Sequence, residues 1–256
     1  MSEKTTRSSS IDKALLLLNC FTEKRFNLTL EDLAKQTGIP RSTIFRMLTS
    51  LESAGYVKRI KLSNKTWYSL GYAFLEKGLM VHRNLDIREY ARESMMALRN
   101  ELNLNVQLAI QDRLDALYIE QIQSWRPIRL YPSIGRRAPL YAAACPRVLL
   151  AYLDEAEQNR ILEQSPMKQF TPNTPTDLHD IKNELKKITI HGFSYSYGEL
   201  FEGTIALAVP VFYPDTKYII AALSIVGLES DFEEDQSYYI SKLKEAALEI
   251  SGKIKQ

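Results

Sequence analysis

The 256-residue sequence contains few of the residues that disulfide frameworks and metal sites require. Its two cysteines, Cys20 and Cys145, have apolar or small neighbours and form no C-x-x-C pair, so neither a disulfide framework nor a zinc site is expected. The three histidines, His82, His179 and His191, are scattered along the chain. Because protein zinc sites are built mainly from Cys and His, we expect no metal site, and no motif indicates a cofactor.

Long apolar runs are also lacking. No uninterrupted apolar stretch approaches the roughly 18 residues that suggest a membrane span, and the first ten residues, MSEKTTRSSS, are polar with no signal-peptide segment behind them. We therefore expect a cytoplasmic protein that does not contact a membrane. The composition, 45% hydrophobic and 25% charged residues, is typical of soluble globular proteins, and this length favours two domains over one.

Basic residues are concentrated at the start of the chain. The net charge is only +2, but the first 70 residues hold 12 of the 33 Lys and Arg residues and 6 of the 31 Asp and Glu residues. That part carries +6, and the remainder, with 21 basic and 25 acidic residues, carries −4. A basic module joined to an acidic one is typical of nucleic-acid-binding proteins, because cationic side chains neutralise phosphates.

The basic part begins with signals for two helices. Residues 8–21 start with serines and continue with apolar residues at helical spacing. The predicted buried face of this first helix comprises Ile11, Ala14, Leu15, Leu18 and Phe21. Thr29 can cap a second helix while Asp32 reaches back to the cap. Gly38 is placed to end that helix in a left-handed conformation, and Pro40 fits the first turn of a third helix.

The third helix has an apolar and a polar face. Its apolar residues are Ile44, Met47, Leu48 and Leu51, and Gly55 is placed to end it. Its polar face carries Arg41, Ser42, Thr43 and Arg46. In a helix-turn-helix such residues enter the major groove, where arginine can bind guanine and small hydroxyls can contact bases or phosphates. These four residues are candidates for base contacts, and the alternative is a solvated basic face on a core helix.

A basic hairpin is predicted after the third helix. Residues 56–71 alternate loosely between apolar and polar side chains, with a turn signal at Ser63 and Asn64. The hairpin carries four cations, Lys58, Arg59, Lys61 and Lys65. They are candidates for phosphate contacts, which position a protein on DNA and make its affinity salt-dependent. Helix, turn, helix and basic hairpin together predict a winged helix-turn-helix that binds double-stranded DNA.

The rest of the chain predicts a mixed α/β domain. Residues 71–84 and 85–102 are helical, Asp86 is available to cap the second helix, and the first is a candidate linker helix. Strands are predicted at 105–113, 116–124, 128–134, 193–198, 204–213 and 217–227, and helices at 140–153, 154–164, 176–192 and 231–255. A single antiparallel or mixed sheet flanked by helices is the simplest arrangement of these elements.

Several of these stretches resemble landmarks of the IclR family of bacterial transcriptional regulators. The N-terminal ones are SIDKALLLLNCF, LEDLAKQTGIPRSTIFRMLTSLESAGYVKR and YSLG, followed by LDIREYARESMMAL. IGRRAPLYAAACPRVLLAYL resembles the family pattern Gly-x-x-x-Pro-Leu-His-Ala-x-x-x-Gly-Lys-x-x-Leu-Ala, and GFSYSYGELFEGTIALAVPVFY is similar to the family's C-terminal signature. The resemblance extends over essentially the whole chain.

The resemblance implies an α+β fold in three parts. A winged helix-turn-helix DNA-binding domain is expected over residues 1–70, a linker helix over 71–84, and a GAF-like α/β effector-binding domain over 85–256. The implied function is that of a ligand-responsive transcriptional regulator, not an enzyme, which binds a palindromic operator as a homodimer or a dimer of dimers. In matching positions the effector pocket is lined by Ala144, Cys145, Ser196 and Ala206.

The implied pocket departs from the residues that the family usually has. The frequent Asp is Ser196, the frequent Cys is Ala206, Gly-Lys is Pro146-Arg147, and the final Asp or Asn of the signature is Tyr213. Loss of a carboxylate and a thiol favours a somewhat larger or more apolar ligand. The stretches RVLLA and AVPV resemble those of family members that sense aromatic acids. Backbone N–H groups at the helix start near Cys145 could bind a ligand carboxylate. Arg147 could add a charge there or be an exposed first-turn residue.

Two enzymatic interpretations carry less weight. Cys145 at a helix start could be a nucleophile with a lowered pKa, but only His191 could serve it as a base, and a small wall residue is favoured. Glu199 and Glu202 could form an acid–base pair, but they more simply orient the pocket loop. The alternative function is a small-molecule-binding protein or a cysteine-dependent enzyme that uses the N-terminal module for dimerisation.

Overall fold

The protein is described here by a computed structural model, which covers residues 9–62, 65–83, 86–126, 134–232 and 235–254. The chain divides into two compact units, Met1–Asn84 and Leu85–Gln256. Each unit has its own hydrophobic core. Within the described ranges, no helix is both long and apolar enough to cross a membrane.

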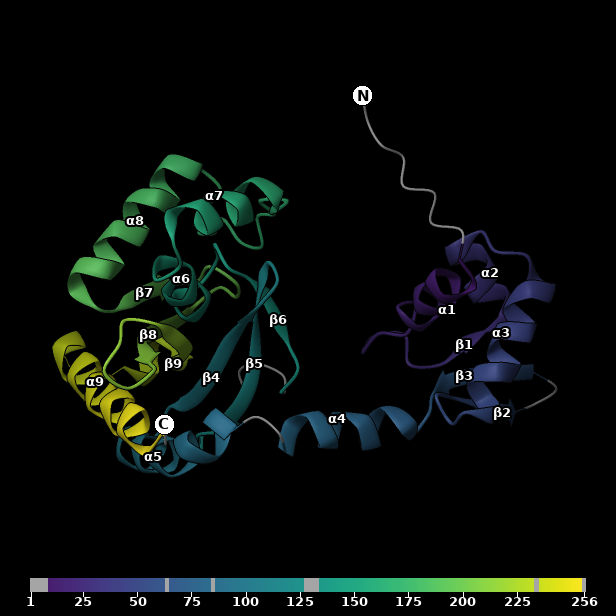
Figure 1. Ribbon diagram of the computed structural model, residues 1–256, viewed down its shortest axis with the longest axis horizontal. Helices are drawn as coiled ribbons and strands as arrows, with labels where there is room; N and C mark the ends of the chain where they lie inside the picture. The colour runs from purple at the N-terminus through teal and green to yellow at the C-terminus, as the bar shows by residue number, and fades with distance from the viewer. Residues whose placement is uncertain (1–8, 63–64, 84–85, 127–133, 233–234, 255–256) are drawn as a thin grey trace. The chain divides into compact units, whose positions relative to one another are not determined.

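The first unit is a three-helix module with a small sheet and a further helix at its end (Figure 1). Its elements are α1 (Ser10–Leu18), β1 (Leu28–Thr29), α2 (Leu30–Thr37), α3 (Arg41–Ser53), β2 (Val57–Leu62), β3 (Lys65–Leu70) and α4 (Ala73–Arg83). The sheet is antiparallel in the order β1-β3-β2. The predicted helix-turn-helix and basic hairpin are therefore confirmed, and the turn predicted at Ser63 and Asn64 lies outside the described residues.

Local side-chain chemistry sets the boundaries of α2 and α3. The Thr29 hydroxyl accepts a hydrogen bond from the Asp32 N–H at 3.2 Å, and the Asp32 carboxylate accepts one from the Thr29 N–H at 2.9 Å. This is the predicted capping box. Gly38 ends α2 with φ 70°, as expected for a residue without a Cβ. Pro40 is the N-cap of α3 and not a residue of its first turn, so that prediction is wrong by one position.

The predicted buried face of α1 is wrong at two positions. Ile11 and Leu15 are 72% and 54% exposed, whereas Leu17 is fully buried and Phe21 packs in the core as predicted. The run ALLLL makes every side of this helix apolar. Periodicity therefore cannot select the buried side, which is decided by packing against α2.

Two glycines join the end of α3 to the start of α4. Gly55 follows α3 with φ 77°, as predicted for the residue that ends this helix. Gly71 donates its N–H to the Tyr56 carbonyl at 2.8 Å, and Ala73 donates to the Gly55 carbonyl at 3.2 Å. A Cβ on Gly71 would lie 2.0 Å from the Gly55 oxygen, so only glycine fits this contact.

The second unit is built around one six-stranded antiparallel sheet in the order β6-β5-β4-β9-β8-β7. Its strands are β4 (Asn105–Asp112), β5 (Asp115–Ile122), β6 (Arg137–Pro139), β7 (Ser194–Tyr197), β8 (Thr204–Phe212) and β9 (Ile219–Leu228). Its helices are α5 (Asp86–Leu102), α6 (Ala144–Ala151), α7 (Glu155–Gln164), α8 (Leu178–His191), the short 3-10 helix η1 (Glu229–Asp231) and α9 (Gln236–Lys253). The predicted single sheet flanked by helices is confirmed. The sequence did not predict the short strand β6. The strand predicted at 128–134 lies almost wholly outside the described residues.

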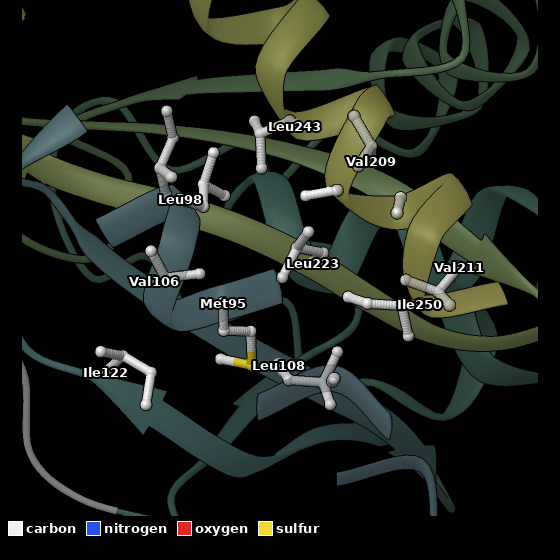
Figure 2. Packing of buried hydrophobic residues seen from close by; sticks show 14 of the residues in the cluster. Met95, Leu98, Val106, Leu108, Ile122, Val209, Val211, Leu223, Leu243 and Ile250 are labelled. Carbon is white, nitrogen blue, oxygen red and sulfur yellow. The ribbon is translucent and has the colours of Figure 1, made fainter. Parts of the chain in front are cut away.

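Helices cover both faces of this sheet and create two cores. On one face Met95 of α5 and Leu243 of α9 pack in one core with large strand residues such as Leu108 and Leu223 (Figure 2). On the other face α6, α7 and α8 pack against small residues such as Ala109, Ala208 and Ala222. These small side chains let α6 lie close to the sheet, and every residue of α6 is buried.

Candidate functional site

The polar face of α3 is presented to solvent while its apolar face anchors it. Ile44 and Leu48 are fully buried, and Met47 and Leu51 pack against the same core. Ser42 and Arg46 are exposed, and Thr43 is half-buried on one flank. Arg41 is exposed on the other flank, where it pairs with Glu31 of α2 at 3.1 Å. Of the four predicted base-facing residues, Ser42 and Arg46 thus lie at the centre of the exposed face.

Two further residues of this face were missed by sequence reasoning. Phe45 is 46% exposed and Thr49 is exposed; Phe45 follows Ser42 by three residues and Thr49 follows Arg46 by three, which places both on the same side of the helix. The Thr49 hydroxyl donates to the Phe45 carbonyl at 2.9 Å. Their helical spacing from Ser42 and Arg46 could have identified both residues. They were missed because the search was limited to charged and hydroxyl residues in the first turns of the helix, which leaves out Thr49 by position and Phe45 by residue type.

The four cations of the hairpin fall into two pairs. Lys58 lies over the Tyr72 ring at 3.0 Å from its centroid, and Arg59 forms an ion pair with Glu52 of α3 at 2.7 Å. Lys61 and Lys65 are exposed. Lys61 and Lys65 are therefore open to solvent, whereas Lys58 and Arg59 also hold the hairpin to its neighbours.

The four predicted effector residues lie in one region where α6 begins over the sheet; three of them are buried and Ala206 is half-buried. Ala144 and Cys145 begin α6, and both belong to the core that also contacts Ala206. Ser196 is directly opposite Ala206 across β7 and β8, and its side chain is 4% exposed. The sequence match therefore brings together residues that the fold places side by side.

A neighbouring row of small residues was not identified from the sequence. Ser194 on β7 faces Ala208 on β8, which faces Ser224 on β9. The Ser194 hydroxyl is buried and makes no hydrogen bond within the described part of the chain. An unsatisfied buried hydroxyl is costly, and such groups are often found where a ligand or an ordered water supplies the partner. This row extends the polar character of the region around Ser196.

Cys145 has the wrong environment for a nucleophile. Burial raises the pKa of its thiol to about 12, and the Sγ atom lies 3.6 Å from the Ala222 carbonyl as a weak donor. A reactive cysteine needs a lowered pKa and access to substrate. Cys145 is therefore a neutral wall residue at neutral pH.

A buried ion pair fixes the start of α6. The Arg147 guanidinium binds both carboxylate oxygens of Glu199 and donates to the Tyr195 carbonyl at 2.7 Å. Glu199 also accepts the Ala143 N–H at 2.8 Å, and Ala143 has φ 72°, which is unusual for a residue with a Cβ. Arg147 is thus a buried anchor and not an exposed residue. Glu199 orients the loop before α6, as expected.

The same ion pair borders a cavity of ≈ 440 Å³. Its wall also includes Tyr195, Tyr197 and the α8 residue Glu184. The four predicted effector residues do not line this cavity. Glu202 is exposed and Glu199 is buried, so they do not form the acid–base pair considered from the sequence. No group of three metal-ligating side chains occurs in the described ranges.

Both units match a known family of proteins. Residues 10–60 match the IclR helix-turn-helix domain, and residues 79–252 match the bacterial transcriptional regulator IclR C-terminal domain. The chain is 38% identical over 249 residues to the HTH-type transcriptional regulator KipR of Bacillus subtilis, over 97% of this chain and 98% of KipR.

Solved structures agree with these matches. The Thermotoga maritima IclR structure is 28% identical, with a TM-score of 0.73 over 95% of this chain and 98% of the other. An IclR homolog from Microbacterium hydrocarbonoxydans in complex with 4-hydroxybenzoate has a TM-score of 0.81 over 96% of this chain and 98% of the other. At 22% sequence identity, this likeness shows only that the two proteins share a fold. The relatives are named as transcriptional regulators, not as enzymes.

Proposed function

This chain belongs to the IclR family of bacterial transcriptional regulators, and on that premise we propose that it binds a roughly palindromic double-stranded DNA operator as a homodimer and responds to a small organic acid. The observation that carries the proposal is the exposed face of α3, where Ser42 and Arg46 stand on a helix anchored by Ile44 and Leu48. It would act in the cytoplasm, where bacterial DNA lies.

In the proposed complex, α3 enters the major groove and the hairpin meets the backbone. Arg46 is the residue for a two-hydrogen-bond contact with guanine, and Ser42 and Thr43 are suited to base or phosphate contacts. Arg41 lies at the edge of this face. Lys61 and Lys65, with Lys58 and Arg59 behind them, supply phosphate contacts that hold the register without reading sequence.

The exposed apolar side of α4 supports dimerisation. α4 has 11 residues, all of which are described, and none of them is buried. It nevertheless exposes large apolar side chains, including Leu75 at 60% and Leu79 at 44%. A helix of this length is marginal in water without packing, so a second copy of the chain is its natural partner. The exposed residues Ile11 and Leu15 of α1 offer a second apolar surface for a dimer or a dimer of dimers.

Replacing Leu75 and Leu79 together with glutamate should convert the dimer to a monomer. Each buried leucine contributes about 1.5–3 kcal/mol, and both subunits lose both side chains, so the dimer dissociation constant should rise by at least about 100-fold. Sedimentation velocity over a concentration series measures this. Lys77→Glu on another side of α4 is the control, and unchanged association of the double variant would contradict this interface.

The region around Ala144, Cys145, Ser196 and Ala206 supports a site for a small acid. The backbone N–H groups at the start of α6 suit a carboxylate. The surrounding alanines and the neutral Cys145 thiol suit an apolar body, and the Ser194 hydroxyl has no hydrogen-bond partner among the residues that the structure describes. A protein of the same fold binds 4-hydroxybenzoate. We infer that the effector is a small organic acid, with aromatic acids among the first to test.

The effector can regulate only if it binds the DNA-competent and DNA-incompetent arrangements with different affinity. Thermal unfolding of the full chain with a panel of small carboxylates and aromatic acids tests for the ligand. An acid at 100 times its dissociation constant should stabilise the protein by about 2.7 kcal/mol, and the same acid should change affinity for operator DNA in a mobility-shift assay at several salt concentrations.

Three outcomes would contradict the proposal. If DNA binding is absent or does not depend on salt, the proposed operator binding is contradicted. If no acid stabilises the protein, the result indicates a DNA-binding protein without an effector. Turnover of an acid would favour the alternative of a cysteine-dependent enzyme. Ser194→Ala is a useful companion variant, because loss of an unsatisfied buried hydroxyl should stabilise the free protein while weakening the effect of a ligand that uses it.

A further inference from the structure

Phe45 is an apolar residue on the exposed side of α3, whose other residues are polar. It lies between Ser42 and Arg46 in sequence and shares the exposed side of α3 with both and with Thr49. Its side chain is 46% exposed, although its neighbours Ile44 and Leu48 show that this helix buries apolar residues completely on its other side. A large apolar ring in the middle of a DNA-facing surface has apolar area left to bury in the complex.

The Phe45 ring is supported from the hairpin. The Arg59 guanidinium lies 5.6 Å from the centre of the Phe45 ring and 5.8 Å from that of Tyr68. Arg59 is itself held in place by an ion pair with Glu52 at 2.7 Å. It also lies opposite Tyr68 in the pairing of β2 with β3. A ring held in this way loses little rotational freedom when it meets a partner.

We propose that Phe45 recognises thymine in the operator by packing on the C5-methyl group, and that Arg59 positions its ring for this contact. Thymine is the base that presents a methyl group in the major groove, and apolar side chains including Phe read it there. Arg46, next to Phe45, is suited to guanine. The two residues together would read a short step containing a G·C and an A·T pair. This inference rests on the proposed operator binding.

The test replaces thymidine in the operator with deoxyuridine, whose base differs from thymine only in lacking the C5-methyl group. Operator duplexes are first selected from random DNA with the full chain, and each thymine is then replaced in turn. Burial of one methyl group corresponds to about fourfold in affinity. In each half-site, replacement of one particular thymidine should therefore lower the affinity about fourfold. Replacement of that thymidine in both half-sites should lower it about fifteenfold. Phe45→Ala should bind the thymine and deoxyuridine duplexes equally.

Arg59→Lys separates positioning from phosphate contact. Lysine keeps the charge but not the planar guanidinium that stacks on the ring. The salt dependence of binding should therefore stay as in the unchanged protein, while discrimination between thymine and deoxyuridine falls. Phe26→Ala, which removes another exposed phenylalanine outside α3 and the hairpin, should change neither quantity.

The outcomes distinguish this inference from the proposed function. If the full chain selects a specific duplex but no thymine responds to deoxyuridine, or if Phe45→Ala keeps the same discrimination, thymine recognition by Phe45 is overturned and operator binding stands. If the chain selects no DNA at all, the proposed function falls and this inference falls with it. Thermal unfolding of each variant shows whether the fold is retained.

Discussion

Arg46→Ala should weaken specific operator binding by about 2 to 6 kcal/mol. A two-hydrogen-bond contact between arginine and guanine is worth about 1–3 kcal/mol of discrimination, and a dimer on a palindrome loses it in each half-site. Arg46 is exposed at the centre of the α3 face, and its removal leaves the buried residues Ile44 and Leu48 in place. The fold should therefore survive, and the loss should be confined to DNA recognition.

Fluorescence anisotropy with specific and random duplexes over a salt series measures this effect. Lys61→Ala on the hairpin should weaken both duplexes similarly and lower the salt slope, because a phosphate contact carries no sequence information. Arg160→Ala, an equal change of charge in the second unit, is the control for net charge. A uniform loss on both duplexes for Arg46→Ala would show that Arg46 contacts phosphate.

Arg147→Met should destabilise the second unit by about 3–5 kcal/mol. Removal of one partner of a buried ion pair leaves the other charge uncompensated, and the side chains of Arg147 and Glu199 are only 4% and 9% exposed. The substitution also frees the Glu199 carboxylate that holds the Ala143 N–H and so the start of α6. We expect the effector response to be lost together with stability.

Urea unfolding followed by circular dichroism measures the change. Arg160→Met is the matched control, because Arg160 pairs with Glu157 on the surface of α7, and such pairs contribute only about 0–1 kcal/mol. The double variant Arg147→Met with Glu199→Gln should recover part of the loss, since it removes the unpaired charge. Strict additivity of the two single changes would contradict an interacting pair.

Much of the first unit could be predicted from the sequence because its signals are local. Thr29, Asp32 and Gly38 fix the ends of α2 through groups at most a few residues apart, and the predicted helix-turn-helix follows from them. The buried side of α1 could not be predicted, because Leu15 and Leu17 are equally apolar and only contact with α2 distinguishes them. The same limit applies wherever composition is uniform around a helix.

In the second unit, the region beneath α6 depends on strand pairing that the sequence does not show. Ser194 and Ser224 come from β7 and β9, and only the register through Ala208 on β8 places them in one row. The burial of Arg147 likewise depends on Glu199, which a distant loop brings to α6. The resemblance pointed to Ser196 and Ala206, and the fold places these side by side, but their role in binding stays a prediction.

The close contact between Gly55 and Gly71 has a mechanical consequence. The residues that terminate α3 also receive the hydrogen bonds that start α4, through the Tyr56 and Gly55 carbonyls. The absence of a side chain at Gly71 lets its backbone lie directly against the Gly55 carbonyl. Because these contacts join backbone to backbone, we expect a rotation of α4 to be transmitted directly to α3.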